Sequence, residues 1–141
     1  MAAGAGEYSL KLDDKGRIIL PAKVRPALAS GAHLTRGQDH CLFLFSEAQF
    51  DAHRESMAEA TPPGMPAVAF DRIFYSSVVT TDVDKQGRLN IPPALRAYAE
   101  LERDLVVIVL ATRMEIWSAA GWAAYLERYE SAYASLSEGV R

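Results

Sequence analysis

The sequence predicts a mostly β protein with flanking α-helices, formed by two tandem ββαββα repeats. Two observations lead to this fold class. The stretch "LDDKGRIILPAKVR" at residues 12–25 returns 71 residues later as "VDKQGRLNIPPALR" at residues 83–96. Polar and apolar residues alternate just before each copy, as in a strand that buries one face. A repeat this long is one supersecondary unit used twice, so neither half need be stable alone.

The repeat divides the chain into four expected segments. They are a first repeat at residues 7–49, a helix, linker and bridging helix at 50–77, a second repeat at 78–121, and a terminal helix with its tail at 122–141. The linker contains "TPPGMP", which is too rich in proline and glycine for regular structure. We expect the alanine- and glycine-rich start and the last five residues to fray.

Each repeat is expected to begin with a β-hairpin followed by a short helix. The predicted strands are residues 8–12 and 17–20 in the first copy and 80–84 and 88–91 in the second. The turns between them combine aspartates, which hydrogen-bond the backbone two residues on, with glycines, which accept a positive φ. These structural turn residues are Asp13, Gly16, Asp84 and Gly87. Pro21 and Pro92 then suit the first turn of a helix, so helices are predicted at 21–28 and 92–99, with Pro26 limiting the first.

The second half of each repeat is a further strand pair and a helix. The predicted strands are residues 33–36, 41–45, 105–110 and 114–117. Ser46 and Gln49 form a capping box at the start of a helix over 46–60. A bridging helix is predicted at 67–77 and a long terminal helix at 118–136. One side of that last helix is expected to carry an aromatic stripe, formed by Trp122, Tyr125 or Leu126, Tyr129, Tyr133 and Leu136.

The composition indicates a small domain in a reducing compartment. A chain of 141 residues, half of them hydrophobic, can bury a core without covalent cross-links. Its one cysteine, Cys41, lies in the apolar run "CLFLF", which favours a buried thiol. Without a disulfide partner, an apolar run of membrane-spanning length or a signal segment, the chain is expected to be cytoplasmic and not to enter a membrane.

The charge distribution matters more than the net charge of −3, which by itself argues against a nucleic-acid partner. Residues 11–25 carry five cations against two acids, whereas residues 100–141 carry seven acids against four arginines. The five cations are Lys11, Lys15, Arg17, Lys23 and Arg25. Positive charge is therefore concentrated around the first copy of the repeated stretch.

The repeated arginines point to a binding function. Turn chemistry explains the aspartate and the glycine, but it gives no reason for arginine to follow glycine twice, at Arg17 and Arg88. A second arginine recurs eight residues later, at Arg25 and Arg96. The planar fork of arginine can grip phosphates or two acceptors on a guanine edge. A rigid hairpin base would aim such a side chain.

Taken together, these residues resemble the tandem halves of MraZ, a family of bacterial transcriptional regulators in the AbrB superfamily. The resemblance covers nearly the whole chain and includes the aromatic-serine junctions at Phe45-Ser46 and Trp117-Ser118. It implies a double-split, AbrB-like β-barrel with pseudo-twofold symmetry inside one chain. The family's Asp-x-x-x-Arg motif is present at 13–17 and 84–88, which implies that Arg17 and Arg88 contact DNA. The full set of expected DNA-binding residues is Lys15, Arg17, Arg88, Lys11, Lys23, Arg25, Lys85 and Arg96.

The resemblance also implies that the subunits form a ring and associate with the nucleoid. The implied partner is double-stranded DNA, with short repeated boxes in the promoter of a division and cell-wall gene cluster, and the protein is expected to regulate its own gene. Several copies on one face would gain avidity from effective concentration. The second copy has Gln86 in place of Lys15 and Asn90 in place of Ile19. We therefore expect the first copy to attract phosphates more strongly.

Other functions remain open at this point. The acidic helices favour an alternative, a protein-interaction module of the antitoxin type without specific DNA binding. Tyr129 and Tyr133 suit either the core or a subunit contact. No nucleophile elbow, phosphate loop or carboxylate pair indicates an enzyme, a cofactor or a small-molecule substrate. His33, His40 and His53 lack ligand spacing, so no metal is expected.

Overall fold

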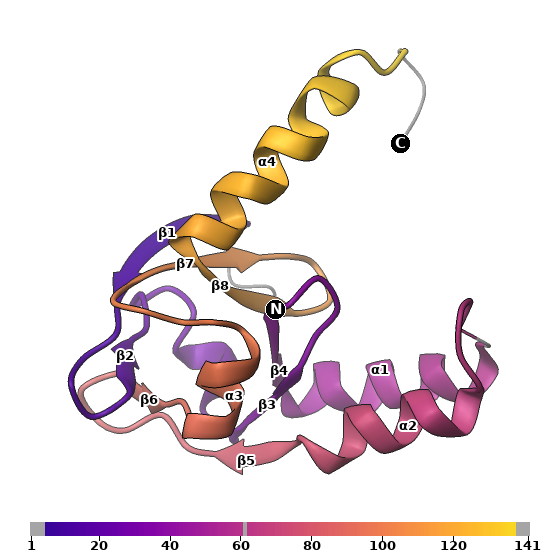
Figure 1. The fold of residues 1–141 in the computed structure, drawn as a ribbon. Helices are drawn as coiled ribbons and strands as arrows, with labels where there is room; N and C mark the ends of the chain where they lie inside the picture. Colours follow the sequence, from indigo (N-terminus) through magenta and orange to yellow (C-terminus); the bar gives the residue numbers. More distant parts are fainter. Residues whose placement is uncertain (1–4, 61, 138–141) are drawn as a thin grey trace.

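The computed structural model describes residues 5–60 and 62–137 of the chain. Its elements follow the predicted order closely, and Figure 1 shows their arrangement. They are β1 Gly6–Lys11, β2 Arg17–Ile19, a 3₁₀-helix at Pro26–Leu28, β3 Ala32–Arg36, β4 Leu42–Ser46, α1 Glu47–Glu59, α2 Ala67–Ser76, β5 Val79–Thr81, β6 Arg88–Asn90, α3 Pro93–Tyr98, β7 Asp104–Val109, β8 Met114–Ser118 and α4 Ala119–Ala134. The mostly β class with flanking helices is confirmed.

The strands form two sheets that interleave the two repeats. A six-stranded antiparallel sheet has the order β1-β7-β8-β4-β3-β5, and β2 pairs with β6 in a separate two-stranded ribbon. This order is symmetric. Reading from one end gives β1, β7 and β8, and reading from the other end gives their counterparts in the other repeat, β5, β3 and β4. Each repeat's first strand pairs with the other repeat's third strand, β1 with β7 and β5 with β3. Neither repeat therefore completes its own sheet.

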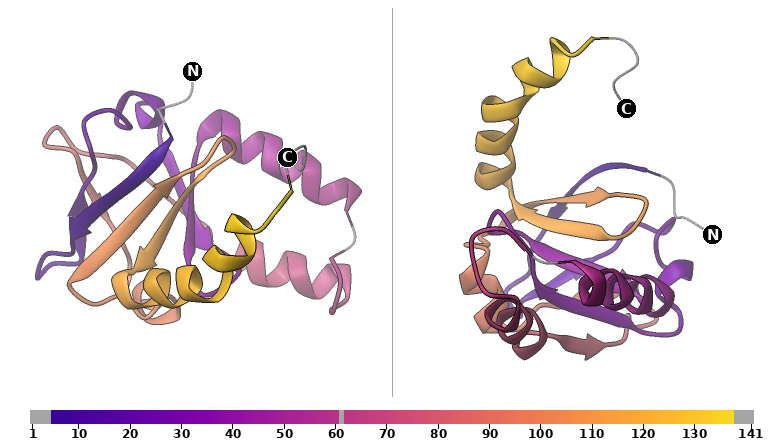
Figure 2. Two further views of the ribbon diagram at one scale, coloured as in Figure 1. Left: turned by 90° about the horizontal axis from the view of Figure 1, so that it is seen from above. Right: turned by 90° about the vertical axis from the view of Figure 1, so that its right-hand side faces the viewer.

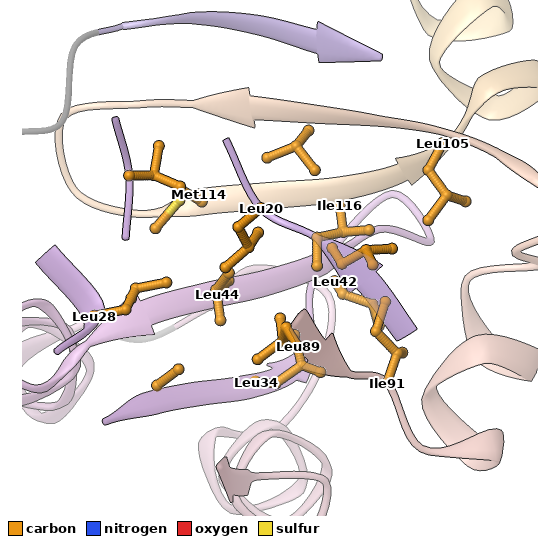
Figure 3. Close-up of a cluster of buried hydrophobic side chains, with 14 of the residues drawn as sticks. Leu20, Leu28, Leu34, Leu42, Leu44, Leu89, Ile91, Leu105, Met114 and Ile116 are labelled. Atoms are coloured by element: carbon orange, nitrogen blue, oxygen red, sulfur yellow. The ribbon is translucent and has the colours of Figure 1, made fainter. Parts of the chain in front are cut away.

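The main core lies between the sheet and the ribbon. Leu34, Leu42 and Leu44 of the sheet pack in one cluster with Ile18 and Leu89 of the ribbon, and all five are at most 1% exposed. Figure 3 shows side chains from both sheets meeting in this cluster. Because Ile18 and Leu89 point into this core, their neighbours on each ribbon strand must point outward.

The opposite face of β4 and β8 carries a second, aromatic core. Phe43 and Phe45 of β4 alternate with the leucines of the main core, and they pack against Phe50 of α1 and Phe74 of α2. The predicted capping box opens α1, because Ser46 accepts from the Gln49 N–H and Gln49 accepts from the Ser46 N–H. Cys41 is buried in this cluster, as predicted, and burial raises the pKa of its thiol.

The helix predicted over residues 21–28 is wrong in type. The segment forms isolated turns and then the 3₁₀-helix Pro26–Leu28, with three-residue hydrogen bonds such as Leu28 N–H to the Arg25 carbonyl. Pro26 lacks the N–H that an α-helix through this point requires, so Pro26 begins the short helix rather than ending a longer one. In the second repeat α3 forms as predicted: Pro92 precedes it in an extended conformation, and Pro93 stands in its first turn, where the missing N–H costs nothing.

The helix α4 projects from the body of the molecule (Figures 1 and 2). Trp122 stacks on Tyr125, and Tyr125 contacts Tyr129, so the predicted stripe exists. Trp117 belongs to the aromatic core, whereas Tyr133 is 77% exposed. No helix in the described ranges is long and apolar enough to cross a bilayer. Of the start and the last five residues that we expected to fray, residues 1–4 and 138–141 lie outside the described residues, while Gly6 already belongs to β1.

Candidate nucleic-acid interface

Two equivalent turns, one in each repeat, build the candidate site. In the first, one carboxylate oxygen of Asp13 accepts from the backbone N–H of Lys15 and of Arg17, each at 2.9 Å. In the second, Asp84 accepts from the N–H of Gln86 and of Arg88, again at 2.9 Å. Gly16 and Gly87 close the turns with φ of 79° and 83°, which other residues adopt only with strain. The same residue types thus produce the same bend twice.

The aspartates also orient the arginines. Arg17 Nε donates to the second Asp13 oxygen at 3.0 Å, and Arg88 Nε donates to Asp84 at 2.6 Å. The hydrogen bond from the Arg17 backbone lowers the pKa of Asp13 most, and that from the Arg88 backbone lowers the pKa of Asp84 most. Within the described part of the chain, the terminal guanidinium nitrogens of both arginines make no hydrogen bond, so they are available to a ligand.

Strand pairing puts the two arginines on one face. In the β2–β6 ribbon Arg17 lies opposite Asn90, Ile18 opposite Leu89, and Ile19 opposite Arg88. Side chains of opposed residues share a face and successive ones alternate. Because Ile18 and Leu89 are buried, the other four side chains form the outer face of the ribbon. Arg17 and Arg88 occupy one diagonal of that face, with 29% and 34% of their side chains exposed.

Arg25 and Arg96 have a different place: each lies over the turn of the other repeat. A Cβ added to Gly87 would overlap Arg25 Cζ, and one added to Gly16 would lie 2.9 Å from Arg96 Cζ. Arg25 Nε donates to the Leu20 carbonyl at 2.9 Å. Arg25 therefore braces the turn at Gly87, whereas Arg96 packs over the turn at Gly16 without a hydrogen bond from its Nε to a described residue. A direct role in binding DNA stays a prediction for both.

The backbone ties the turns together in the same reciprocal way. The Leu20 N–H donates to the Gly87 carbonyl and the Ile91 N–H to the Gly16 carbonyl, both at 2.8 Å. Leu20 and Ile91 are equivalent residues of the two repeats. Each turn is thus held by the strand of the other repeat, which fixes the distance between the two outward arginines.

The predicted lysines differ in how their charge is used. Lys11 forms an exposed ion pair with Asp104 at 2.5 Å, and this hydrogen bond lowers the pKa of Asp104. Lys15, Lys23 and Lys85 are exposed and form no ion pair with a described residue. Lys15 and Lys85 lie within the two turns and have free charge there, whereas the charge of Lys11 is partly neutralised.

One cation near the site had no signal in the sequence. Arg103 precedes β7, and its carbonyl accepts the Leu12 N–H at 2.8 Å. Its side chain lines a hollow of about 450 Å³ together with Lys11, Arg17 and Ile19. The strand register makes Ser30 the equivalent residue in the first repeat, so the repeat gives no indication of this arginine. Only the pairing of β1 with β7 brings Arg103 to Arg17.

The site lies at the end of the molecule away from α1 and α2 (Figures 1 and 2). The helix α1 carries an excess of acids, namely Glu47, Asp51, Glu55 and Glu59, against Arg54. The separation keeps these four acids of α1 away from the arginine-bearing end, where Asp13 and Asp84 are each paired with an arginine. No group of three or more potential metal ligands was found among residues 5–60 and 62–137.

The chain is similar to known proteins over nearly its whole length. The family model described as "MraZ protein, putative antitoxin-like" matches residues 3–72 and again residues 74–139. A protein of Leifsonia xyli subsp. xyli named Transcriptional regulator MraZ is 49% identical over 135 residues, 96% of this chain and 94% of the relative. Proteins of the same name from Paenarthrobacter aurescens and an Arthrobacter strain are 49% and 47% identical, covering 94% and 96% of this chain and 93% and 95% of theirs. The chain belongs to the MraZ family.

Proposed function

We propose that this protein is a transcriptional regulator that binds specific DNA sequences through the outer face of the β2–β6 ribbon. The observation that carries the proposal is the strand register, which puts Arg17 and Arg88 on one exposed face. The major groove of B-DNA admits a two-stranded β-ribbon, and an arginine fork pairs with the two acceptors of guanine there. The aspartates hold each arginine by Nε only, which leaves the fork to the DNA.

The other cations divide by their surroundings. Lys15, Lys23 and Lys85 are exposed and contact phosphates in this proposal. Lys11 attracts phosphates more weakly, because its ion pair with Asp104 partly neutralises its charge. Arg25 and Arg96 hold the turns in place and add positive charge behind them. Phosphate contacts fix the orientation of the protein, and base contacts supply the sequence preference.

The fold that presents the ribbon is, in our proposal, an AbrB-like double-split barrel with pseudo-twofold symmetry. Two reciprocal contacts between the repeats support it. The first strand of each repeat pairs with the third strand of the other, and a backbone N–H of each repeat donates to the glycine carbonyl in the turn of the other. An internal twofold axis between β2 and β6 relates the two arginines. Such symmetry suits duplex DNA, whose two strands are themselves related by a twofold axis.

We further propose that several copies assemble into a ring on repeated boxes in the promoter of a division and cell-wall gene cluster, the protein's own promoter included. Two base-reading arginines per subunit bind weakly alone, and avidity over repeated boxes compensates. The exposed stripe of α4 supports self-association, since Tyr129, Tyr133 and Leu136 are 43%, 77% and 55% exposed around a hollow of about 570 Å³. Such a regulator works in the cytoplasm at the nucleoid.

The proposal is tested by replacing the two outward arginines. R17A/R88A should abolish the shift of promoter DNA in a gel assay across a range of salt concentrations, while circular dichroism and oligomer mass stay unchanged. The matched control is R54A/R72A, which removes two exposed arginines from α1 and α2 at the other end of the molecule. Specific binding that survives in R17A/R88A would contradict the assignment.

A second candidate is a protein-interaction module of the antitoxin type. It is favoured by the family model's description and by exposed apolar residues on α2, where Val68 and Ile73 are 53% and 47% exposed. This function predicts one stoichiometric protein partner whose binding is lost in V68D/I73D. It also predicts no salt-sensitive, sequence-specific DNA shift, so the gel assay separates the two functions.

A further inference from the structure

The outer face of the ribbon breaks the symmetry of the two repeats at one pair of positions. Arg17 and Arg88 are equivalent residues and lie on one diagonal of that face. Ile19 and Asn90 are also equivalent, and they occupy the other diagonal. A twofold axis through the pair Ile18–Leu89 would superpose Arg17 on Arg88. The same axis would superpose the apolar side chain of Ile19 on the amide of Asn90, so the symmetry is broken there.

Neither residue is explained by packing. Ile19 is 57% exposed, although isoleucine in a strand usually serves a buried face. Asn90 is exposed, and its side chain makes no hydrogen bond with a described residue. Asparagine is a poor strand former, so its presence in β6 is not a gain of local stability. A single exposed isoleucine is ordinary on a protein surface, but this one stands directly opposite Arg88, in the face between the two arginines.

The chemistry of the two side chains differs where a base edge would lie. An asparagine amide pairs with N6 and N7 of adenine in the major groove, whereas an aliphatic side chain contacts the methyl group of thymine. We infer that Ile19 and Asn90 are specificity-determining residues that make the two halves of the ribbon read different base pairs. Asn90 selects an adenine beside the guanine read by one arginine, and Ile19 selects a thymine methyl at the equivalent place in the other half.

The consequence is a recognised box with a direction. Two symmetric arginines alone would favour a palindromic box, because turning the protein about its internal axis would present the same face. The unequal pair removes that equivalence. Each subunit then binds in one orientation, which lets successive subunits on repeated boxes all point the same way. The inference rests on the proposed DNA-binding function of the ribbon.

The test is selection of binding sites from a randomised DNA library by four proteins: wild type, N90I, I19N and the double swap I19N/N90I. The wild type should select a directional box. Each single variant presents the same residue at both corners and should select a more nearly palindromic one, with affinity for the wild-type box reduced about 5- to 100-fold for N90I. The double swap restores unequal corners and should select a directional box again.

The outcomes separate this inference from the function on which it rests. Both positions are exposed, so all variants should give the circular dichroism of the wild type, and E55Q on α1 serves as the binding control. A palindromic wild-type box, or single variants that select the wild-type box with unchanged affinity, would overturn the inference and leave the DNA-binding function standing. If the wild type selects no sequence at all, the proposed function fails and the inference fails with it.

Discussion

The glycines at the centre of the two turns allow a quantitative test of the bracing contacts. In Gly87→Ala the new residue must keep φ near 83°, and left-handed backbone strains a non-glycine residue by about 1–2 kcal/mol. The new Cβ would also overlap Arg25 Cζ, so the guanidinium has to move. Movement breaks its hydrogen bond to the Leu20 carbonyl, a loss of about 2 kcal/mol for a charged donor.

The expected destabilisation is therefore about 3 to 4 kcal/mol for Gly87→Ala, a large part of the 5–15 kcal/mol typical of a domain. Gly16→Ala suffers the same backbone strain, and its Cβ, 2.9 Å from Arg96 Cζ, also makes that side chain shift. The buried Nε of Arg96 has no hydrogen-bond partner among the described residues to lose. We expect about 1–2 kcal/mol for Gly16→Ala.

Urea denaturation followed by tryptophan fluorescence measures both changes, at one protein concentration because assembly affects apparent stability. A double-mutant cycle isolates the contact: in an R25A background the effect of Gly87→Ala should fall to the backbone strain alone. Equal losses for the two glycines, or an unchanged loss in R25A, would refute the bracing role of Arg25.

Three further predictions concern the arginines, the aspartates and α4. R17K and R88K keep the charge but lose the fork, so each should weaken binding to the selected box about 10-fold while binding to unrelated DNA changes little, as measured by fluorescence anisotropy. The lowered pKa values of Asp13 and Asp84 mean that their support of the turns is complete above the unfolded value near 3.9 and is lost as pH falls through the folded value. The urea midpoint should therefore decrease as the pH is lowered below about 4, and it should decrease less steeply in D13N/D84N. Equal slopes of midpoint against pH in the two proteins would contradict this. Y133A should reduce oligomer mass in mass photometry without changing circular dichroism, since Tyr133 is 77% exposed, and an unchanged mass would exclude this side chain from the subunit contact.

The turns are the part of the structure that the sequence predicted best. Asp13 and Gly16 act through neighbours within four residues, and both the bend and its repetition are visible as a pattern. The capping box at Ser46 is local in the same sense. Where an interaction spans only a few residues, residue chemistry largely determines the geometry.

The contacts between the repeats were not predicted from the sequence. The position of Arg25 over Gly87 depends on how the two halves interleave, and the expected contact of Arg25 with DNA stays a prediction. Arg103 joins the site only because β1 pairs with β7, nearly a hundred residues away in sequence. Pro26 was interpreted as the end of a helix, whereas it begins a 3₁₀-helix. The first two depend on long-range pairing, which spacing within one repeat cannot reveal.

The most direct test of the ribbon as the DNA-binding surface is photo-cross-linking. With p-benzoylphenylalanine in place of Ile19, irradiation of the complex with promoter DNA should yield a covalent adduct to bases of the box. The same group in place of Arg72 on α2 should yield none. Cross-links from position 72 but none from position 19 would show that DNA lies elsewhere on the molecule and would contradict the account.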